Sequence, residues 1–483
     1  MLVVRTIYLK GSPVGKYHGQ FTDNNQNGKG HMKYSSGDEY DGEWKNGSRC
    51  GYGVMKYVNG NVYTGQWKNG KHSGKGHSKL AGGGEYEGEW KNGMYHGQGV
   101  FHGGPNDKNN CKKFEGEFKK GKCDGYGEAE WGCGGKYKGN FKNDMTCGYG
   151  ECEYPNGDKY QGNFEKGKKT KGKTTFSNGE TYEGNFKDNE KHGYGEYKCH
   201  NGDKYQGNFE MDKYHGKGKM IFSNGDKYEG DFKDNMMHGY GEHECHNGGD
   251  RYQGIFEQDK KTKGKMTYKS GAIYDGEWNN DSRNGYGIYY WTSQKRHEGF
   301  WKNGRRDGPG KMVHENGTTY EGKWCGCVRT SEPGTITYPN GDKYFGKTNN
   351  DYYDDNEYRH DKGKMNYSNG EVYEGDWKNN KRHGIGKMIY LNDKIYDGHW
   401  KDDKWNGEGI LYYENDEIYS GNFVDNKLHG KGKMTFLTGA KYDGYWRNNV
   451  WHGKGKMIYS NGSVFEGDWK NCKCCFGVLT LHP

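Results

Sequence analysis

Apolar and polar residues alternate in short stretches of this chain. Within residues 373–377, Tyr373, Gly375 and Trp377 occupy every second position, and acidic residues fall between them. Successive side chains of a β-strand point to opposite faces, so the alternation predicts a strand with one aromatic face and one charged face. Residues 384–390 alternate in the same way and place Met388 and Tyr390 on one face. The pattern predicts two strands within this short stretch.

The aromatic-x-Gly-x-aromatic pattern recurs along almost the whole chain. Twenty copies begin between Tyr17 and Phe465, and the nineteen intervals across these 448 residues average 23.6 residues. The glycine is present in every copy, and the second aromatic residue is missing only at Thr348. An isolated hairpin is marginally stable, whereas tandem copies stabilise one another by stacking. We therefore predict that the copies join into one antiparallel meander.

The polar segments between the strands predict the connections. Residues 378–383, which are rich in Asn and Lys, separate the two strands of one copy and are predicted to form a loop. The segment 368–371 contains Asn369-Gly370, and Asn-Gly is a strong signal for a tight turn between paired strands. Asn-Gly recurs at the end of many copies, so each copy is predicted to be one β-hairpin.

Composition decides what kind of core such hairpins can have. The 483 residues include 86 Gly and 43 Tyr, only 29% are hydrophobic, and 16% are aromatic. Good apolar helix formers are scarce, which excludes long amphipathic helices, and the many rings exclude intrinsic disorder. A ring can lie flat where the neighbouring residue is glycine, so ring–glycine contacts replace an aliphatic core. The predicted fold class is an all-β, elongated, single-layer antiparallel β-meander of about twenty tandem 23-residue hairpins, a rod or curved trough.

A complete copy reads Tyr-Glu-Gly-Asp-Trp-Lys-Asn-Asn-Lys-Arg-His-Gly-Ile-Gly-Lys-Met-Ile-Tyr over residues 373–390. It resembles the MORN repeat (membrane occupation and recognition nexus), and the resemblance covers nearly the whole chain. The resemblance implies a non-enzymatic scaffold, since arrays of this kind belong to cilia, flagella and other cytoskeletal structures. We expect an N-terminal capping segment at 1–16, a continuous array at 17–471 and a C-terminal cap at 472–483.

Three segments depart from the repeat. Residues 102–113 contain an insertion that predicts a longer hairpin loop. Residues 320–363 lose several repeat positions and include an acidic stretch at 351–357, which is either a hinge, a partner-binding loop or a decayed copy with a tolerated insertion. Residues 472–483 are locally apolar, and a terminal repeat needs a cap or a mate, so a homodimer contact is expected there.

Other chemistry is discounted on residue types and spacing. The net charge of +8 comes from interspersed 73 basic and 65 acidic residues, which does not suit a nucleic-acid surface. We predict no catalytic residues, no cofactor and no metal, since the recurrent histidines occupy one repeat position, as expected of a structural role. The seven histidines are His96, His192, His215, His238, His383, His429 and His452.

Localisation is predicted from cysteine usage and hydropathy. The thirteen cysteines form no regular framework, and the chain has no long apolar run. These features favour an intracellular protein of the cytoplasm or cytoskeleton, with a cilium or flagellum as the setting that the resemblance suggests.

Two surfaces are candidates for binding. A single-layer sheet leaves its aromatic face without a second layer, which predicts an exposed groove that binds partner proteins of a large assembly. Its representative residues are Tyr205, Phe209, Tyr228, Phe232, Tyr373, Trp377, Tyr396, Trp400, Tyr442 and Trp446. The alternative is a peripheral membrane adaptor that binds anionic phospholipids through the lysine-bearing face. Its representative residues are Lys217, Lys219, Lys431 and Lys433.

Overall fold

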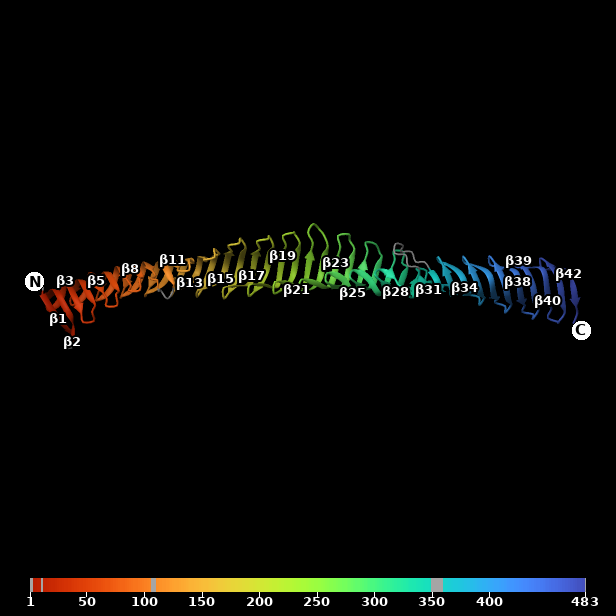
Figure 1. The fold of residues 1–483 in the computed structure, drawn as a ribbon, viewed down its shortest axis with the longest axis horizontal. Helices are drawn as coiled ribbons and strands as arrows, with labels where there is room; N and C mark the ends of the chain where they lie inside the picture. The colour runs from red at the N-terminus through yellow and green to blue at the C-terminus, as the bar shows by residue number, and fades with distance from the viewer. Residues whose placement is uncertain (1–2, 10–11, 106–109, 349–358, 483) are drawn as a thin grey trace. The chain divides into compact units, whose positions relative to one another are not determined.

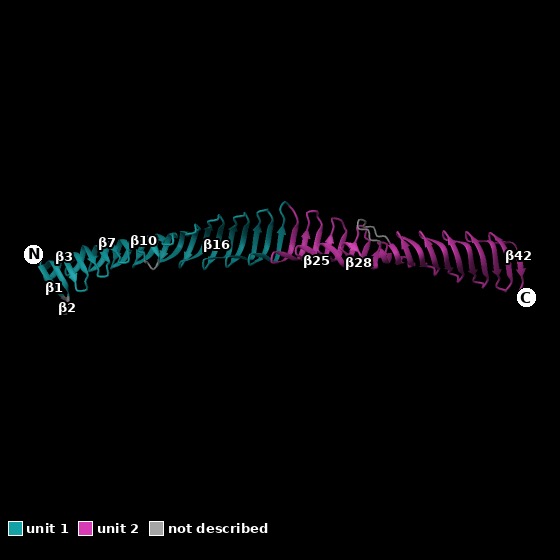
Figure 2. Cartoon of the chain, viewed as in Figure 1, with its two compact units in different colours: residues 1–247 teal, residues 248–483 magenta. Residues whose placement is uncertain are grey.

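The structure is a computed structural model that describes residues 3–9, 12–105, 110–348 and 359–482. Every regular element in these ranges is a β-strand, and the chain divides into two compact units, residues 1–247 and 248–483 (Figure 2). Figure 1 shows that, within each unit, the strands follow one another in sequence order.

Unit 1 contains the strands β1 Val3–Leu9, β2 Ser12–Thr22, β3 Asn25–Tyr34, β4 Glu39–Lys45, β5 Ser48–Lys56, β6 Val62–Lys68, β7 Lys71–Lys79, β8 Glu85–Lys91, β9 Met94–His102, β10 Cys111–Lys119, β11 Lys122–Trp131, β12 Lys136–Lys142, β13 Met145–Glu153, β14 Lys159–Glu165, β15 Lys168–Thr175, β16 Thr181–Lys187, β17 Glu190–Lys198, β18 Lys204–Glu210, β19 Lys213–Ile221, β20 Lys227–Lys233 and β21 Met236–Glu244.

Unit 2 contains the strands β22 Arg251–Glu257, β23 Lys260–Thr267, β24 Ile273–Asn279, β25 Ser282–Tyr290, β26 Arg296–Lys302, β27 Arg305–Val313, β28 Thr319–Cys325, β29 Val328–Arg329, β30 Gly334–Thr337, β31 Lys343–Thr348, β32 Arg359–Asn366, β33 Val372–Lys378, β34 Lys381–Ile389, β35 Ile395–Lys401, β36 Lys404–Tyr412, β37 Ile418–Val424, β38 Lys427–Thr435, β39 Lys441–Arg447, β40 Val450–Ile458, β41 Val464–Lys470 and β42 Lys473–Thr480.

Neighbouring strands pair antiparallel along both units, so each unit is a meander of tandem hairpins. In unit 1 this pairing runs from β1–β2 to β20–β21. In unit 2 it runs from β22–β23 to β41–β42, and β28 pairs with both the short β29 and β30. The predicted fold class, an all-β antiparallel meander of repeated hairpins, is confirmed.

The connection inside a repeat is shorter than the sequence suggested. Lys378 pairs with Lys381, so only Asn379 and Asn380 connect β33 to β34, with φ of 50° and 69°. The six-residue loop predicted over 378–383 is therefore wrong. Asparagine tolerates the left-handed region at both central positions of a tight turn, and the strands consequently extend further than their apolar pattern does.

The connection between repeats lies where Asn-Gly predicted it. The backbone N–H of Gly370 donates to Tyr367 O at 3.0 Å, and that of Tyr367 donates to Glu371 O at 2.9 Å. Gly370 has φ of 95°, in the region that glycine adopts without steric cost. The Asn-Gly segments therefore set the turns that join one hairpin to the next.

The core consists of rings seated on glycines, as the composition indicated. Tyr373 is fully buried, and its ring lies over Gly375 of β33 and Gly386 of β34. A Cβ atom added at Gly386 would overlap the Tyr373 hydroxyl. Edge-to-face contacts join Tyr373 to Trp377 at 5.0 Å and to Trp400 of the next repeat at 5.3 Å between ring centroids. Each ring therefore links two repeats, which is why single hairpins depend on their neighbours.

Candidate interaction surfaces

The ten aromatic residues proposed as an exposed groove are buried. None of Tyr205, Phe209, Tyr228, Phe232, Tyr373, Trp377, Tyr396, Trp400, Tyr442 and Trp446 exceeds 5% exposure. The prediction that these side chains present an open aromatic surface is therefore wrong. They form the core itself, because other side chains of the same repeats cover them.

The polar atoms of these rings bond within the chain. The Tyr373 hydroxyl donates to Asp376 O at 2.9 Å, and Trp400 Nε1 donates to Gly386 O at 2.8 Å. Burial raises the pKa of the Tyr373 hydroxyl well above its ordinary value. A partner therefore has no free donor to reach in these rings, and their bonds fix the register between strands.

In twelve repeats the residue nine positions after the repeat tyrosine covers its ring. In five repeats this residue is itself a ring stacked on the tyrosine, with centroids 3.7–4.8 Å apart: His72, Tyr95, Tyr214, Trp405 and Trp451. In seven others a cation lies over the tyrosine: Arg49, Lys169, Lys191, Lys261, Arg283, Arg329 and Arg382. We call this position the covering position. Sequence reasoning missed it because its residue type changes from copy to copy.

A second set of aromatic residues forms the partly exposed layer on this face. It lies six positions before the repeat tyrosine and packs half-buried against the core of unit 2. We call this set the outer aromatic row: Tyr338, Tyr367, Tyr390, Tyr413 and Phe436. Successive members are two strands apart, about 9.6 Å at the usual strand spacing. The recurrence of a ring at this position is visible in the sequence and could have indicated the row.

The four lysines proposed to face lipid lie on the opposite, polar face. Lys217 pairs with Asp231 at 2.8 Å, Lys219 with Glu229 at 3.7 Å and Lys433 with Asp443 at 3.0 Å. The Lys431 ammonium lies 5.7 Å from the centroid of the Tyr445 ring. Carboxylates on adjacent strands therefore offset most of this positive charge.

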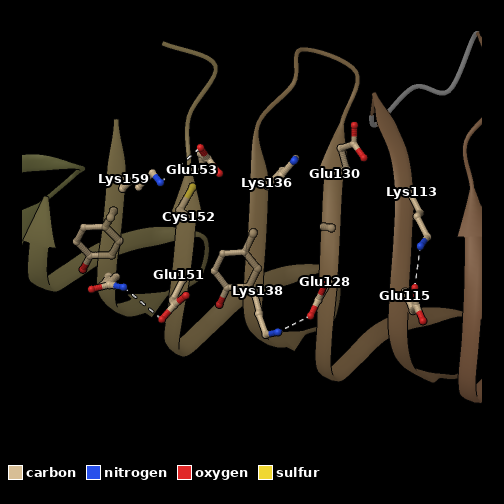
Figure 3. A pocket seen from close by; sticks show the side chains of 14 residues that line it. Lys113, Glu115, Glu128, Glu130, Lys136, Lys138, Glu151, Cys152, Glu153 and Lys159 are labelled. Carbon is tan, nitrogen blue, oxygen red and sulfur yellow. Dashed lines mark hydrogen bonds and ion pairs between the residues drawn. The ribbon is translucent and has the colours of Figure 1, made fainter. Parts of the chain in front are cut away.

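The same charge balance lines a hollow of about 480 Å³ on β10–β14 (Figure 3). Lys138 pairs with Glu128 at 2.6 Å across two strands, and Gln161 Nε2 donates to Glu151 at 3.3 Å. Lys113 pairs with Glu115 at 2.7 Å on β10. Because positive and negative side chains alternate along its walls, the hollow suits a polar peptide that carries both kinds of charge better than it suits an anion.

Exposed tyrosines also stand on the polar face of unit 1. Tyr126, Tyr149, Tyr194 and Tyr240 occupy one repeat position, between two glycines, and are 51–58% exposed. The sequence analysis did not single them out, although the recurring Gly-Tyr-Gly segment was available as a signal. Large exposed rings at one register are a common feature of binding surfaces.

Titratable and metal-ligating groups do not assemble into a site in the described part of the chain. No group of three or more His, Cys, Asp or Glu could hold a metal ion there. His72 is a covering residue stacked on Tyr63, and burial lowers its pKa to about 4. None of the thirteen cysteines, all within the described residues, forms a disulfide. No helix in the described part of the chain is long and apolar enough to cross a membrane.

The irregular segments keep the sheet continuous on both of their sides. Lys113 of β10 pairs with His102 of β9, so the strands on either side of the 102–113 insertion are paired, and residues 106–109 within it lie outside the described residues. Thr348 of β31 likewise pairs with Arg359 of β32. The acidic stretch 351–357 lies outside the described residues.

The last strand exposes apolar side chains. Every residue of β42 is exposed, and Phe476, Val478 and Leu479 are 82%, 70% and 53% exposed. β42 pairs with β41 on one side. No other strand among the described residues pairs with β42, and exposed apolar groups beside an edge without a partner strand favour pairing with another chain.

A single-layer meander of tandem hairpins, with stacked rings as its core, defines a repeat protein of the solenoid class. The MORN repeat model matches sixteen segments, and the chain belongs to the MORN-repeat family. The matched residues are 17–39, 40–62, 63–85, 86–108, 114–134, 137–159, 160–181, 182–204, 205–227, 228–250, 274–296, 297–319, 373–392, 396–417, 419–441 and 442–464. The copies beginning at Tyr252, Tyr320, Tyr344 and Phe465 are not matched. MORN repeats form a non-catalytic scaffold for protein or membrane interaction.

Two solved structures resemble parts of this chain. The TCP domain of Drosophila melanogaster SAS-4, in complex with a proline-rich motif of Ana2, is 15% identical over 34% of this chain and 86% of its own, with a TM-score of 0.22. The TCP10 domain of Danio rerio CPAP, in complex with a STIL peptide, is 12% identical over 68% of this chain and 97% of its own, with a TM-score of 0.19. No curated protein matches the chain significantly.

Proposed function

We propose that this protein is a scaffold that binds partner proteins and spaces them in a larger assembly of the cytoskeletal type. The observation that carries the proposal is the outer aromatic row of unit 2. Its rings recur once per repeat and stay half-exposed above a buried core. Rigid aromatic side chains contribute strongly to protein interfaces because burying them costs little conformational entropy. The partner-binding part of the aromatic face is therefore this row, and the ten buried rings support it from below.

A regular row of rings also supplies the spacing function. Each repeat offers the same half-exposed ring at about 9.6 Å intervals, so a partner that spans several repeats has its position fixed by several rings. The cations of the covering position, such as Arg382 over Trp400 at 4.4 Å, lie beside the row. Arg382 already donates to Asp403 through Nε and Nη2, so such cations hold the rings beneath the row in place.

Homodimerisation through the C-terminal strand is a second part of the proposal. The exposed apolar side chains of β42 and its unpaired edge suit antiparallel pairing with β42 of a second copy. Replacing both Phe476 and Val478 by Asp is expected to reduce the mass of the particle in solution by half, measured by multi-angle light scattering. A dimer of unchanged mass would contradict this placement of the contact.

Membrane binding is less well supported. Three of the four candidate lysines are paired with carboxylates, and binding to anionic lipid requires clustered and unpaired cations. Flotation with vesicles that contain phosphatidylinositol phosphates is expected to leave the protein unbound at physiological salt. Binding that is lost when Lys217, Lys219, Lys431 and Lys433 are replaced by Ala would instead favour the membrane adaptor.

The scaffold proposal is tested by affinity capture from the native cell. We expect a defined set of partner proteins with the wild-type chain and their loss when Tyr390 and Tyr413 are both replaced by Ser. A matched control replaces the exposed Tyr52 and Tyr286 of the other face by Ser, which should retain those partners. An identical partner set with all three proteins would show that the outer aromatic row does not bind them.

A further inference from the structure

The polar face of unit 1 carries an alternation with a period of two repeats. Tyr149 of β13 lies between two glycines, and Glu151 follows two residues later. The equivalent positions of β15 are Lys171 and Lys173, with Thr170 in place of the first glycine. Tyr194 and Glu196 follow on β17, and lysines return on β19. All the side chains at these positions on β13, β15, β17 and β19 are exposed. Strands with a ring and a negative charge therefore alternate with strands that carry two positive charges.

The strands between them complete a symmetric pattern around β16. β14 and β18 each carry a neutral Gln-x-Asn pair on this face. β12 carries Lys138, whereas β20 carries Glu229 and Asp231. At these two positions, strands at equal distances from β16 are opposite in charge or carry neutral amides, and Glu183 of β16 faces its own counterpart. Nothing in the folding of one copy requires this relation, because β13 and β19 lie six strands apart.

We propose that the polar face of β12–β20 binds the same face of a second copy of this chain. The two-fold axis lies between the copies, parallel to the strands and over β16. Such an axis reverses the strand order and keeps the position along each strand. Tyr149 and Glu151 then face Lys217 and Lys219 of the second copy. An axis over β15 or β17 would instead set like-charged strands against each other.

The same axis makes the inner pair complementary. Lys171 and Lys173 of β15 face Tyr194 and Glu196 of the second copy. No carboxylate pairs with Lys171 or Lys173 within the described part of this chain. Each lysine therefore meets either a carboxylate or the face of a phenol ring, which attracts a cation. Isologous contacts of this kind are the usual form of a closed dimer.

The size of the surface suits a dimer. Nine strands at about 4.8 Å spacing make a strip roughly 40 Å long and about 20 Å wide, or about 800 Å² on each copy, the area of a standard interface. The two positions on each strand carry five lysines and five acidic residues over the strip, so their net charge is zero. A further row of residues, at the ends of these strands, is richer in lysine and forms a polar rim that stays in contact with water. Its lysines are Lys136, Lys159, Lys198, Lys204 and Lys227.

The test is a charge exchange between two strands that do not touch in one copy. Glu151 and Lys219 lie about 29 Å apart at six strand spacings, so only contact between copies can couple them. Sedimentation at low salt of the full chain carrying Phe476→Asp and Val478→Asp, which removes the contact proposed at β42, is expected to show a dimer. Adding Glu151→Lys or Lys219→Glu should weaken this dimerisation at least tenfold, and adding both changes together should return it to within threefold of the parent chain. Circular dichroism of each variant verifies that the sheet is retained.

A matched control removes an equivalent ion pair elsewhere. Lys364 pairs with Glu374 at 3.6 Å, as Lys219 pairs with Glu229 at 3.7 Å, but it lies in unit 2 outside the strip. Lys364→Glu should leave dimerisation unchanged. A wild-type chain that stays monomeric at about 100 µM, single variants that dimerise normally, or a double variant without rescue would each overturn the proposal. A dimer lost only on substitution of Phe476 and Val478 would place the contact at β42 instead.

Discussion

A single glycine decides whether a repeat tyrosine can be buried. Gly375 and Gly386 lie beneath the Tyr373 ring, and a methyl group at Gly386 would overlap the ring hydroxyl. Both positions require glycine because a larger side chain would not fit beneath the ring. Gly384, two residues earlier, has φ of 71° beside the bulge that follows Gly375, and glycine is required there by the backbone conformation.

We predict that Gly386→Ala lowers the free energy of unfolding by about 2–3 kcal/mol, because the ring must move and its contacts to both tryptophans loosen. Urea denaturation followed by tryptophan fluorescence measures the change. Gly82→Ala is the control, since a Cβ at Gly82 meets no atom within 4 Å. Equal effects of the two substitutions would refute the role assigned to the ring–glycine contact.

His297 is the exception among the repeat rings. It replaces the tyrosine, is fully buried, and neither of its ring nitrogens has a hydrogen-bond partner. Burial lowers its pKa to about 3 from the ordinary 6.5. The unfolded chain therefore binds a proton below pH 6.5 that the folded chain does not. The corresponding stability is fully present above pH 6.5 and is lost as the pH falls toward 3.

We predict that His297→Tyr stabilises unit 2 by about 1–2 kcal/mol at pH 7.5, because the phenol can bond a backbone carbonyl as its counterparts do. At pH 5 this stabilisation should be larger by about 2 kcal/mol, because protonation of His297 in the unfolded chain then destabilises the wild-type protein. Calorimetry at both pH values measures it. The exposed His399→Tyr should show no such growth, and an equal gain for His297→Tyr at both pH values would contradict the assignment.

At the scale of one hairpin, the covering position explains why the aromatic face is closed. Arg382 lies 4.4 Å from the Trp400 ring and bonds Asp403 at 3.0 Å through Nε. Trp405 and Trp451 likewise cover the rings of Tyr396 and Tyr442 by stacking on them. A flat cation and a flat ring are thus interchangeable here, because each covers a ring and each keeps water from it.

We predict that Arg382→Ala lowers the free energy of unfolding by about 1–2 kcal/mol, because it uncovers Tyr373 and Trp400. Arg382→Trp should recover at least half of that loss. Thermal melts followed by circular dichroism provide the comparison, with Lys387→Ala on the polar face as a control near zero. A tryptophan variant as unstable as the alanine variant would show that the ion pair with Asp403, and not coverage, is what matters.

The sequence predicted the hairpins well because their signals are local. Tyr373, Gly375 and Trp377 fix a strand and its buried face, and Asn369-Gly370 fixes a turn. Burial of the rings was not predictable in the same way. It depends on a covering residue that is Arg in one repeat, His in another and Trp in a third, so no residue type recurs to signal it.

At the scale of the whole chain, function depends on which surfaces remain after the core is closed. Surfaces that remain include the outer aromatic row of unit 2, the polar face of unit 1 and the strand β42. The first is proposed to bind partner proteins and the other two to bind second copies. The sequence assigned residues to the two faces of the sheet, but the ten rings that it predicted as a surface are buried, since exposure is a property of packing and not of residue type.

Photo-cross-linking of the full chain in its native cell tests the scaffold account most directly. A cross-linking residue placed in turn at Tyr338, Tyr367, Tyr390, Tyr413 and Phe436 should capture partner proteins, with different partners or partner segments at different repeats. The same probe at Tyr149 should capture a second copy of the chain. Absence of any captured protein along the row, or capture of one segment at one repeat alone, would contradict a protein that spaces its partners along its length.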